Sequence, residues 1–531
     1  MIMLGGRAIE GWSRGMLVFW LGLVGCGLLS PAVSILWQWP GPDTDAISFL
    51  PAALHYRSGE GLINPVWAGI DQTDPSGMKR FTLHGPLFPM TVAKLLPTGR
   101  VEDFVWPLTV FRLATILILA SVLTGLASWV PGKSGIGIRG SWFPLAALAM
   151  LADGAMRTGL YGRPESLVAP LVAAGFAVLV FHIGGGRASE FVAFGLFGCC
   201  AAVSPGAGFL AVLVGMTALT TTHWFGAATS GGRLLRLSLL GTTALVVGAA
   251  CVAMSPHGLI DSLEGIRNAG KRDVGSLSIG WSQFLRYWLF WWDRPFFGPP
   301  MLLAAGTATI AMSLRAAPSA RAWLVVGFVF CAGGCWLFGL KVAAVTYNLA
   351  AFSTVGFAWL VAWGWGLGKA MGSAPRLRAR RWLLVAALLL PCNLVHVKTG
   401  IEIHQMVRTG TGLSAARRAA AGVLRPEDTI LVNSGTWVLP AESLMMTQWL
   451  GGPVPRVERS AGRLLWIRPL TGSSSEALPD AFKDWRSIFQ FGSAERPAVF
   501  GIPVTKFGSG YSFEVLELVA VREREPRPEP M

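Results

Sequence analysis

Long apolar runs follow one another along most of this chain, and they constrain its fold more than any other feature. From Met16 to about Val397, run after run is long enough to cross the roughly 30 Å hydrocarbon core of a bilayer. Only 14% of the residues are charged, whereas an average soluble domain has about 25%. The sequence therefore predicts an α-helical polytopic membrane protein. We expect about eleven transmembrane helices, at residues 16–36, 105–129, 141–157, 165–183, 190–204, 206–222, 236–255, 299–315, 321–338, 342–366 and 382–398.

The basic residues predict the orientation of these helices. The first run follows Arg7 and Arg14 and has no convincing small-residue cleavage site, so we interpret it as a retained helix. Every second loop is then short, basic and almost free of acids, which places it in the cytoplasm together with the N-terminus. These loops contain Lys133, Arg139, Arg187, Arg233, Arg236, Arg315, Arg321, Lys369, Arg376, Arg378, Arg380 and Arg381. The net charge of +15 is mostly this topology signal, and no basic face interleaved with aromatic residues indicates nucleic-acid binding.

An odd number of helices places the other loops and the C-terminal chain outside. We expect a multi-pass protein of the inner membrane, part of the cell envelope, with its C-terminal domain periplasmic. Residues 1–399 would form the transmembrane domain, with large outer loops at about 37–104 and 256–298. Residues 400–520 would form a small outer α/β domain and residues 521–531 a disordered tail. Within that domain the patterns predict a helix at GLSAARRAAAGVL, strands at TILVNSGTWVL, RLLWIRPL, RPAVFGIPV and YSFEVLELVAV, and a second helix at ALPDAFKDWRSIFQFG.

Candidate functional residues gather in the outer loops. Asp43 and Asp45 follow the first helix, where a carboxylate pair is costly unless it faces water or a polar cavity. Basic and polar residues suited to an anionic head group lie in the two outer loops and at the start of the tenth helix; they are Lys79, Arg80, His84, His257, Arg267, Lys271, Arg272, Lys341 and Tyr347. All seven cysteines lie in hydrophobic runs, and neither CxxC pairs nor histidine-rich spacings indicate a metal cluster.

The order of several short motifs resembles the polytopic glycosyltransferases of the GT-C class, which includes aminoarabinose transferases and protein O-mannosyltransferases. These motifs are the acidic pair, Gly59 at the end of the next helix, His84-Gly85-Pro86-Leu87 before the second helix, and Arg163-Pro164-Glu165 before a later one. The resemblance covers roughly the first 220 residues. This chain departs from the pattern where Gly85 replaces a more usual proline and Glu165 a more usual aspartate. The resemblance implies an inverting transferase that uses a polyprenyl-phosphate-linked sugar and a glycan, lipid or protein acceptor.

The residue types fit that chemistry. Asp45, with Asp43, would activate the acceptor as a general base, and the loop cations would hold the departing lipid phosphate. Arg163 and Glu165 would join the substrate site, and Asp43, Asp45 and Glu165 could hold a Mg²⁺ or Mn²⁺ ion if one is used. The membrane lipids are the remaining expected partners.

Simpler roles stay open for each group. The aspartates could cap the next helix, Arg163 and Glu165 could mark a helix start, and His84 could shape a turn. Lys341 could be an ordinary snorkelling residue, and Arg267–Arg272 could be the solvated face of an interfacial helix. A transporter or flippase of a lipid-linked substrate is the alternative function, but it would favour charges near the midplane and internal repeats. A non-catalytic scaffold would not need the aspartate pair.

Overall fold

The computed structural model divides the chain into two compact units. It describes residues 18, 22, 32, 35–37, 44–66, 80–81, 85–129, 163–181, 187–224, 231–274, 394–433, 435–443, 446–448, 462–470, 484–495, 498–499, 502–503 and 510–519. Unit 1 comprises Met1–Val33, Thr82–Phe88 and Leu108–His396, and unit 2 comprises Ser34–Phe81, Pro89–Pro107 and Val397–Met531. Unit 2 therefore combines the C-terminal chain with most of the first predicted outer loop.

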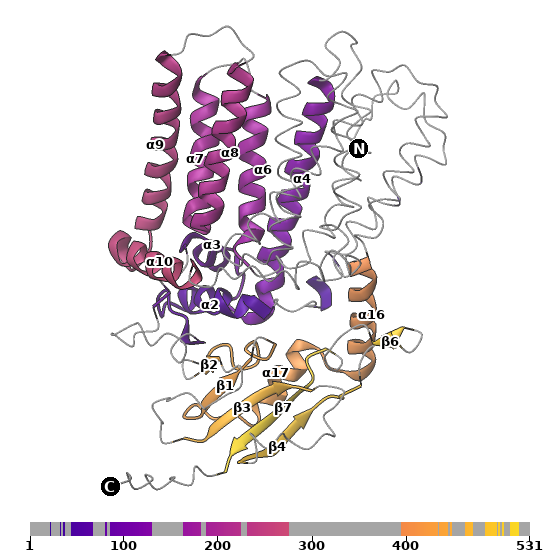
Figure 1. Ribbon diagram of the computed structural model, residues 1–531. Coiled ribbons are helices and arrows are strands. Elements are labelled where there is room, and N and C mark those ends of the chain that lie inside the picture. Colours follow the sequence, from indigo (N-terminus) through magenta and orange to yellow (C-terminus); the bar gives the residue numbers. More distant parts are fainter. Residues whose placement is uncertain are drawn as a thin grey trace, which may run out of the picture. The chain divides into compact units, whose positions relative to one another are not determined.

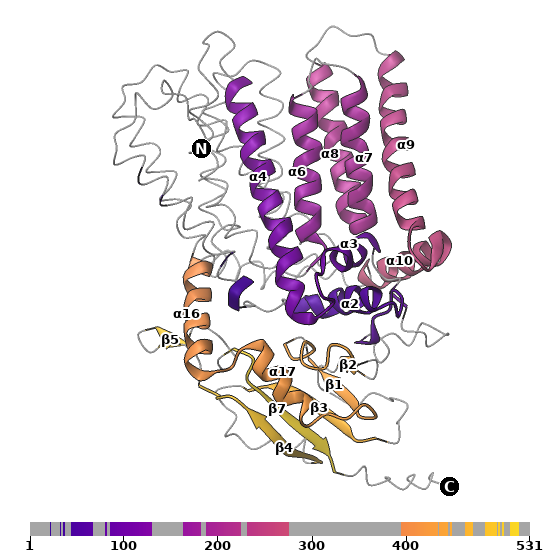
Figure 2. The same ribbon diagram turned by 180° about the vertical axis from the view of Figure 1, so that it is seen from behind.

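Helices dominate the described part of unit 1 (Figures 1 and 2). They are α4 (Val105–Trp129), α6 (Glu165–Phe181), α7 (Arg187–Val203), α8 (Pro205–Trp224), α9 (Gly231–Ala253) and α10 (Gly258–Val274). The segments predicted at 105–129, 165–183, 190–204, 206–222 and 236–255 are confirmed as helices, with ends that differ by up to five residues. The predicted spans 141–157, 299–315, 321–338 and 342–366 lie outside the described residues, and only parts of 16–36 and 382–398 lie within them.

One described helix segment, Leu234–Ala253, is both long and apolar enough to cross a membrane, with a mean hydropathy of 1.8. The segments Ser166–Leu179 and Ala188–Val203 are shorter apolar helices. Figures 1 and 2 show α6, α7, α8 and α9 side by side, and α7 packs against the other three.

Small residues let these helices approach closely. A Cβ added at Gly198 on α7 would lie 2.3 Å from the carbonyl oxygen of Ala244 on α9, and one at Gly175 on α6 would lie 2.3 Å from the Phe197 ring. The Phe197 ring in turn contacts Phe176 and Phe194, at centroid distances of 5.3 and 5.5 Å. Close approach of helices through small residues is typical of helix association in membranes.

Gly85 is required by the same kind of close packing. A Cβ at this position would lie 2.1 Å from the carbonyl oxygen of Ala202, near the end of α7. The Gly85 that departs from the GT-C motif therefore occupies a place where any side chain would collide with backbone.

Unit 2 contains a five-stranded mixed sheet in the order β2-β1-β3-β7-β4. β1 pairs in parallel with β2 and β3, whereas β7 is antiparallel to both β3 and β4. The strands are β1 (Thr429–Val432), β2 (Met446–Gln448), β3 (Leu464–Pro469), β4 (Trp485–Phe491) and β7 (Phe513–Leu518); β5 (Ala498–Val499) and β6 (Ile502–Pro503) form a separate pair. The helices α16 (Leu394–Thr409) and α17 (Leu413–Ala421) precede the sheet (Figure 1). The predicted α17 and the strands around β1, β3 and β7 are confirmed, and β2 was not predicted.

The helix predicted at ALPDAFKDWRSIFQFG is wrong over its described part, because Trp485–Phe491 forms strand β4. Trp485, Ile488 and Phe489 have the i, i+3, i+4 spacing of a helix face, and this spacing led to the wrong prediction. The register shifts between Ser487 and Phe489, and a bulge of this kind adds one residue that breaks the alternation of a strand. Phe489 and Phe491 then contact Phe513 on β7, at centroid distances of 6.0 and 5.6 Å.

Four short helical elements are described in the predicted first outer loop. They are η1 (Thr44–Ser48), α2 (Leu50–Ser58), α3 (Leu87–Leu95) and η3 (Val101–Phe104). Gly59 ends α2 in the left-handed region with φ of 87°, which a residue with a Cβ adopts at a cost. The predicted role of Gly59 as the end of this helix is confirmed.

Candidate functional site

Asp45 lies on η1, a short helix that a buried asparagine holds in place. The Asn64 side-chain amide donates to the carbonyl oxygens of Ile47 and Ser48, at 3.1 and 3.0 Å, and its oxygen accepts from the Val66 backbone N–H at 3.1 Å. Asn64 is fully buried, as is Ile47. Because all three polar contacts are satisfied inside the unit, the backbone around Asp45 is fixed relative to residues 61–66. The Asp45 side chain and all of Asp43 lie outside what the structure describes.

Arg80 is joined to the same segment. Arg80 and Ile63 form an isolated antiparallel bridge, and the Phe81 N–H donates to the carbonyl oxygen of Leu62 at 3.0 Å. Phe81 also packs edge-on against Phe49, with 6.4 Å between ring centroids. The predicted site positions Asp45 and Arg80 thus stand on two stretches of backbone that are both anchored to residues 61–66.

A buried histidine near the end of α2 pairs with an exposed carboxylate in this scaffold. His55 is 1% exposed, and its Nδ1 contacts a carboxylate oxygen of Glu60. Its Nε2 is buried and has no hydrogen-bond partner among the described residues. Sequence reasoning did not select His55, Glu60 or Asn64. The only signal was their place between the acidic pair and Arg80. Glu60 and Asn64 also lie in the turn-forming stretch GEGLINP.

The other predicted site residues lie in unit 1 or outside the described ranges. Arg163 is half-buried at the start of α6, where its carbonyl oxygen accepts from the N–H and the hydroxyl of Ser166. Glu165 is the first residue of α6, and its side chain is not described. Pro164 in the first turn matches the helix-start role, and a substrate-binding role for Arg163 and Glu165 stays a prediction.

The second outer loop contains α10. His257 precedes this helix, and its backbone N–H is 3.3 Å from the Ser255 hydroxyl. α10 exposes Arg267 and also Ile260, which is 78% exposed, while Ser262 is buried. The segment is therefore a helix with mixed apolar and charged exposure, and both the substrate-binding role and the interfacial-helix interpretation stay predictions. Lys271 and Arg272 lie on α10 without described side chains, and Lys79, His84, Lys341 and Tyr347 lie outside the described residues.

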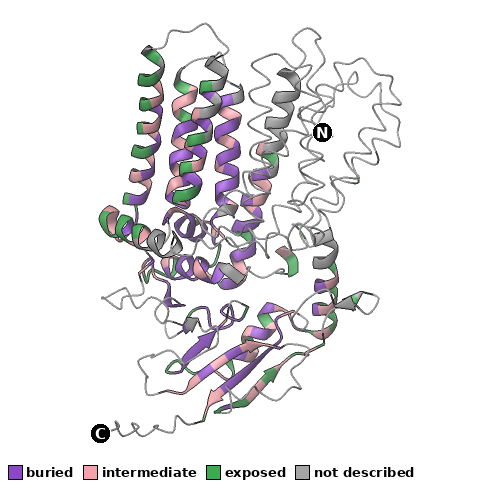
Figure 3. Cartoon of the chain, in the orientation of Figure 1, coloured by how far each residue is buried: buried purple, intermediate pink, exposed green. Residues whose placement is uncertain are grey.

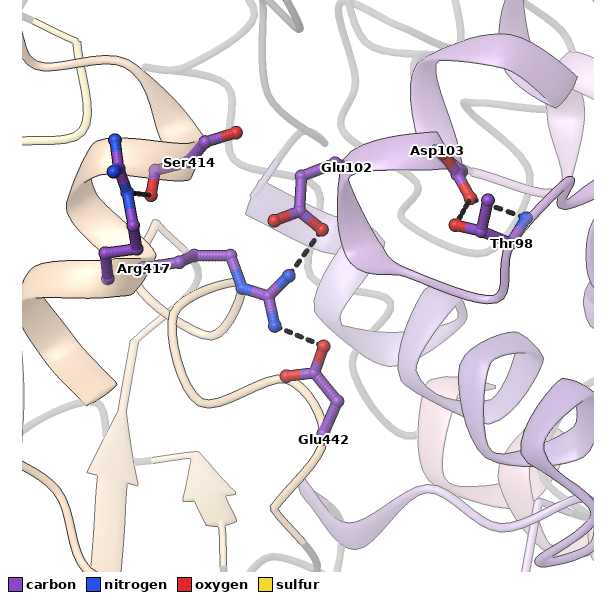
Figure 4. A network of polar contacts seen from close by, with 7 residues as sticks. Thr98, Glu102, Asp103, Ser414, Arg417 and Glu442 are labelled. Carbon is purple, nitrogen blue, oxygen red and sulfur yellow. Dashed lines mark hydrogen bonds and ion pairs between the residues drawn. The ribbon is translucent and has the colours of Figure 1, made fainter.

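A charged network joins η3 to α17 across more than 300 residues of sequence. The Arg417 guanidinium pairs with Glu102 through Nη1 and with Glu442 through Nη2 (Figure 4). The side chains of Arg417 and Glu102 are each 18% exposed. Beside them the fully buried rings of Phe104 and Trp437 lie 6.0 Å apart. An ion pair held at an apolar contact is geometrically fixed, so the C-terminal chain and residues 98–104 form one packed structure.

This junction contains a polar pocket with a volume of about 420 Å³. Its lining residues are Arg100, Glu102, Ser414, Arg417, Arg418, Ala421 and Glu442. Sequence reasoning did not find it, because its walls come from segments that only the fold brings together.

A second ion pair anchors the sheet. Asp428 is fully buried and accepts from the Arg463 side chain at 2.7 and 3.1 Å and from the Arg425 backbone N–H at 2.8 Å. Burial alone raises the pKa of Asp428, but the hydrogen bonds from Arg463 and Arg425 and the charge of Arg463 outweigh it. The pKa of the Asp428 carboxyl is therefore held below its usual range.

No group of three or more His, Cys, Asp or Glu side chains able to hold a metal occurs among the described residues. The three predicted metal ligands, Asp43, Asp45 and Glu165, have no described side chain. The predicted metal site therefore stays a prediction.

Comparison with known proteins places this architecture in a class. No protein-family model matches the chain, and no curated protein matches it. Among solved structures, ArnT from Cupriavidus metallidurans bound to undecaprenyl phosphate matches with a TM-score of 0.52 and 14% identity, over 96% of this chain and 99% of that one. The apo form of ArnT matches with a TM-score of 0.51 and 14% identity, over 95% and 98%. The Archaeoglobus fulgidus oligosaccharyltransferase is less similar, with a TM-score of 0.48 and 13% identity over 91% and 74%.

The chain therefore has the fold of the polytopic membrane glycosyltransferases of the GT-C class. The resemblance seen in the short motifs is confirmed at the level of the fold, along nearly the full length of both chains.

Proposed function

We propose that this protein is a membrane glycosyltransferase that moves a sugar from a polyprenyl-phosphate carrier to an acceptor on the outer face of the membrane. The observation that carries the proposal is the near full-length match to ArnT, whose structure contains undecaprenyl phosphate. The ordered motifs add to it, because Asp45 follows the first predicted helix as the acidic residue does in GT-C enzymes.

The reaction would be a single displacement with inversion. An acceptor hydroxyl or amine attacks the anomeric carbon of the sugar, and the bond between that carbon and the carrier phosphate breaks. The phosphate leaves with the electron pair, and the acceptor proton passes to the carboxylate of Asp45 or Asp43. Cations of the outer loops, with Arg80 and Arg267 among the candidates, would stabilise the charge that develops on the phosphate.

The scaffold around η1 supports this role for Asp45. A catalytic carboxylate must be held to within a fraction of an ångström, and fixed positions are obtained from buried, hydrogen-bonded supporting residues. Asn64 supplies such a support, since its three hydrogen bonds connect the end of η1 to the segment that pairs with Arg80.

Charges in the described helices favour an enzyme over a transporter. Glu190 on α7 and Arg236 on α9 pair with each other close to the starts of their helices. A transporter of charged lipid-linked substrates would place such groups near the middle of the membrane.

The test compares Asp45→Asn and Asp43→Asn with the unmodified protein in membrane vesicles. The donor is first identified from the glycan and lipid profile of a deletion strain, and transfer of the labelled sugar is then followed. Losing a general base typically lowers the rate by about 10²–10⁴-fold, whereas a helix-capping aspartate tolerates asparagine with little loss. Glu495→Gln, an exposed acid of unit 2, is the matched control and should transfer normally. Full transfer by both single variants and by the double variant would refute the proposal.

A further inference from the structure

The pocket beside Arg417 is built from one polar face of α17 and two distant segments. Ser414, Arg417, Arg418 and Ala421 follow the i, i+3, i+4, i+7 spacing of a single helix face. Leu413, Ala416 and Ala420 occupy another face of α17 and are buried. The helix is thus anchored by its apolar residues, while residues of its polar face line the pocket.

The charge balance of the pocket favours an anion. Both of its carboxylates, Glu102 and Glu442, are already paired with Arg417. Neither Arg100 nor Arg418 has a carboxylate partner within ion-pair distance among the residues that the structure describes. Three guanidinium groups against two carboxylates leave the pocket with a net positive charge.

A further donor strengthens this preference. The Arg417 Nε–H is buried and has no hydrogen-bond partner in the described part of the chain.

The size and lining of the pocket define the rest of the ligand. A volume of about 420 Å³ lies within the usual range for small-molecule sites. Ala421 is the one apolar residue among the seven that line it. Hydroxyl groups of a sugar could hydrogen-bond to Ser414 and to carboxylate oxygens of Glu102 and Glu442.

We propose that this pocket binds a sugar unit that bears a carboxylate or a phosphate, as part of the acceptor. This inference rests on the proposed glycosyltransferase function, and it assigns the C-terminal chain a role in choosing the acceptor. Arg100 and Arg418 hold the anionic group, and Arg417, fixed between Glu102 and Glu442, orients the sugar ring.

The test measures binding to the purified full-length protein in detergent by calorimetry. Glucuronic acid and glucose 6-phosphate are the anionic probes, and glucose is the matched neutral probe. We expect the anionic sugars to bind about tenfold more tightly than glucose, because each charge-assisted hydrogen bond is about twice as strong as a neutral one. Comparing the carboxylate with the phosphate probe shows which anion the pocket prefers.

Variants connect this binding to the named residues. Arg100→Gln and Arg418→Gln should each weaken binding of the anionic sugars by about two- to fivefold, the range expected for exposed charges, and leave glucose binding unchanged. Arg486→Gln, at an exposed arginine on β4 of the same unit, should change nothing. With an acidic acceptor, the first two variants should raise KM and preserve kcat.

Equal affinity of the wild-type protein for all three sugars would overturn the inference, as would unchanged affinity in the Arg100→Gln, Arg418→Gln double variant. Either result would leave the proposed function intact, since binding is read without sugar transfer. Conversely, Asp45→Asn should leave glucuronic acid binding unaltered, so that failure of the Asp45 test would not be confused with failure of this one.

Discussion

The exposed apolar side chains of α9 in unit 1 contrast with the buried apolar core of unit 2. In unit 1 the helix α9 exposes Leu234 and Leu245, at 74% and 73%, and much of this helix is green in Figure 3. In unit 2 large apolar side chains such as Trp437 and Phe513 are fully buried. A contiguous apolar surface of the first kind is unfavourable in water, whereas it is expected for a helix that faces lipid.

The buried polar groups differ in the same sense. The buried polar residues described in unit 1 are the hydroxyl residues Thr109, Thr115, Ser255 and Ser262, whereas unit 2 also buries His55, Glu402, Asp428 and Glu514. The hydroxyl of Thr115 is satisfied within its own helix, by the carbonyl oxygen of Phe111 at 2.8 Å. Asp428 instead needs Arg463 from another part of the chain. The hydroxyl of Thr115 is therefore satisfied locally, whereas the carboxylate of Asp428 depends on a long-range partner.

The largest effect should follow from removing Asp428. Breaking a buried ion pair typically costs about 3–5 kcal/mol. Because the Arg463 side chain is 25% exposed, we expect Asp428→Ala to lower the free energy of unfolding of unit 2 by about 3 kcal/mol. This loss is measured by urea unfolding of the full-length protein in detergent, with proteolysis of the C-terminal chain as the readout. Arg486→Ala removes an exposed partner of Glu517 and should cost under about 1 kcal/mol.

The Asp428 carboxylate also makes the stability of unit 2 depend on pH. The pKa of Asp428 is lower in the folded protein than in the unfolded chain, where aspartate has a pKa of about 3.9. Its stabilisation is therefore fully present above about pH 4 and is lost as the pH falls through the folded pKa. The Asp428→Ala variant should lack this part of the acid sensitivity, and an identical acid profile in both proteins would contradict the assignment.

The second prediction tests whether the exposed face of α9 contacts lipid. An arginine at the centre of a transmembrane helix costs about 2.5–3.5 kcal/mol on insertion scales, so Leu245→Arg should reduce the membrane-inserted, protease-resistant protein. Val519→Arg, at a 56% exposed position of unit 2, should stay within about 0.5 kcal/mol, as at an aqueous surface. Equal tolerance of the two substitutions would show that both surfaces face water.

The sequence predicts the helices of unit 1 better than their ends. Apolar runs indicate the membrane-embedded parts, but α7 begins at Arg187 rather than 190, and α9 at Gly231 rather than 236. The first turns of both helices contain charged residues, which hydropathy assigns to loops. The pairing of Arg236 with Glu190 is a reason for the helices to continue there, and it depends on two segments 46 residues apart.

The candidate site, too, can be predicted only in part from the sequence. Asp45 and Arg80 can be selected by residue type and position, since both follow or precede an expected membrane helix. Asn64 and Arg417 cannot be selected in this way, because their roles arise from contacts that form only in the fold. The partners of Asn64 are 16 and 17 residues away in the sequence, and Glu102 is 315 residues away from Arg417. The pattern of α17 predicts an amphipathic helix but not which arginine will face η3.

The smallest stability effect, with the most direct consequence for function, concerns Asn64. Asn64→Ala leaves the buried Val66 N–H and two carbonyl oxygens without this partner, and we expect a loss of about 2 kcal/mol. Since Asn64 fixes the backbone at Asp45, sugar transfer should fall by about 10- to 100-fold in kcat, the range expected when a reacting group is misplaced by up to about 1 Å. Asn433→Ala is the matched control, because the Asn433 oxygen likewise accepts from the Gly435 and Thr436 N–H groups in a turn of unit 2. It should cost comparable stability while leaving kcat unchanged. Equal loss of transfer in both variants would mean that activity follows the stability of unit 2 as a whole, and Asn64 would then have no specific positioning role.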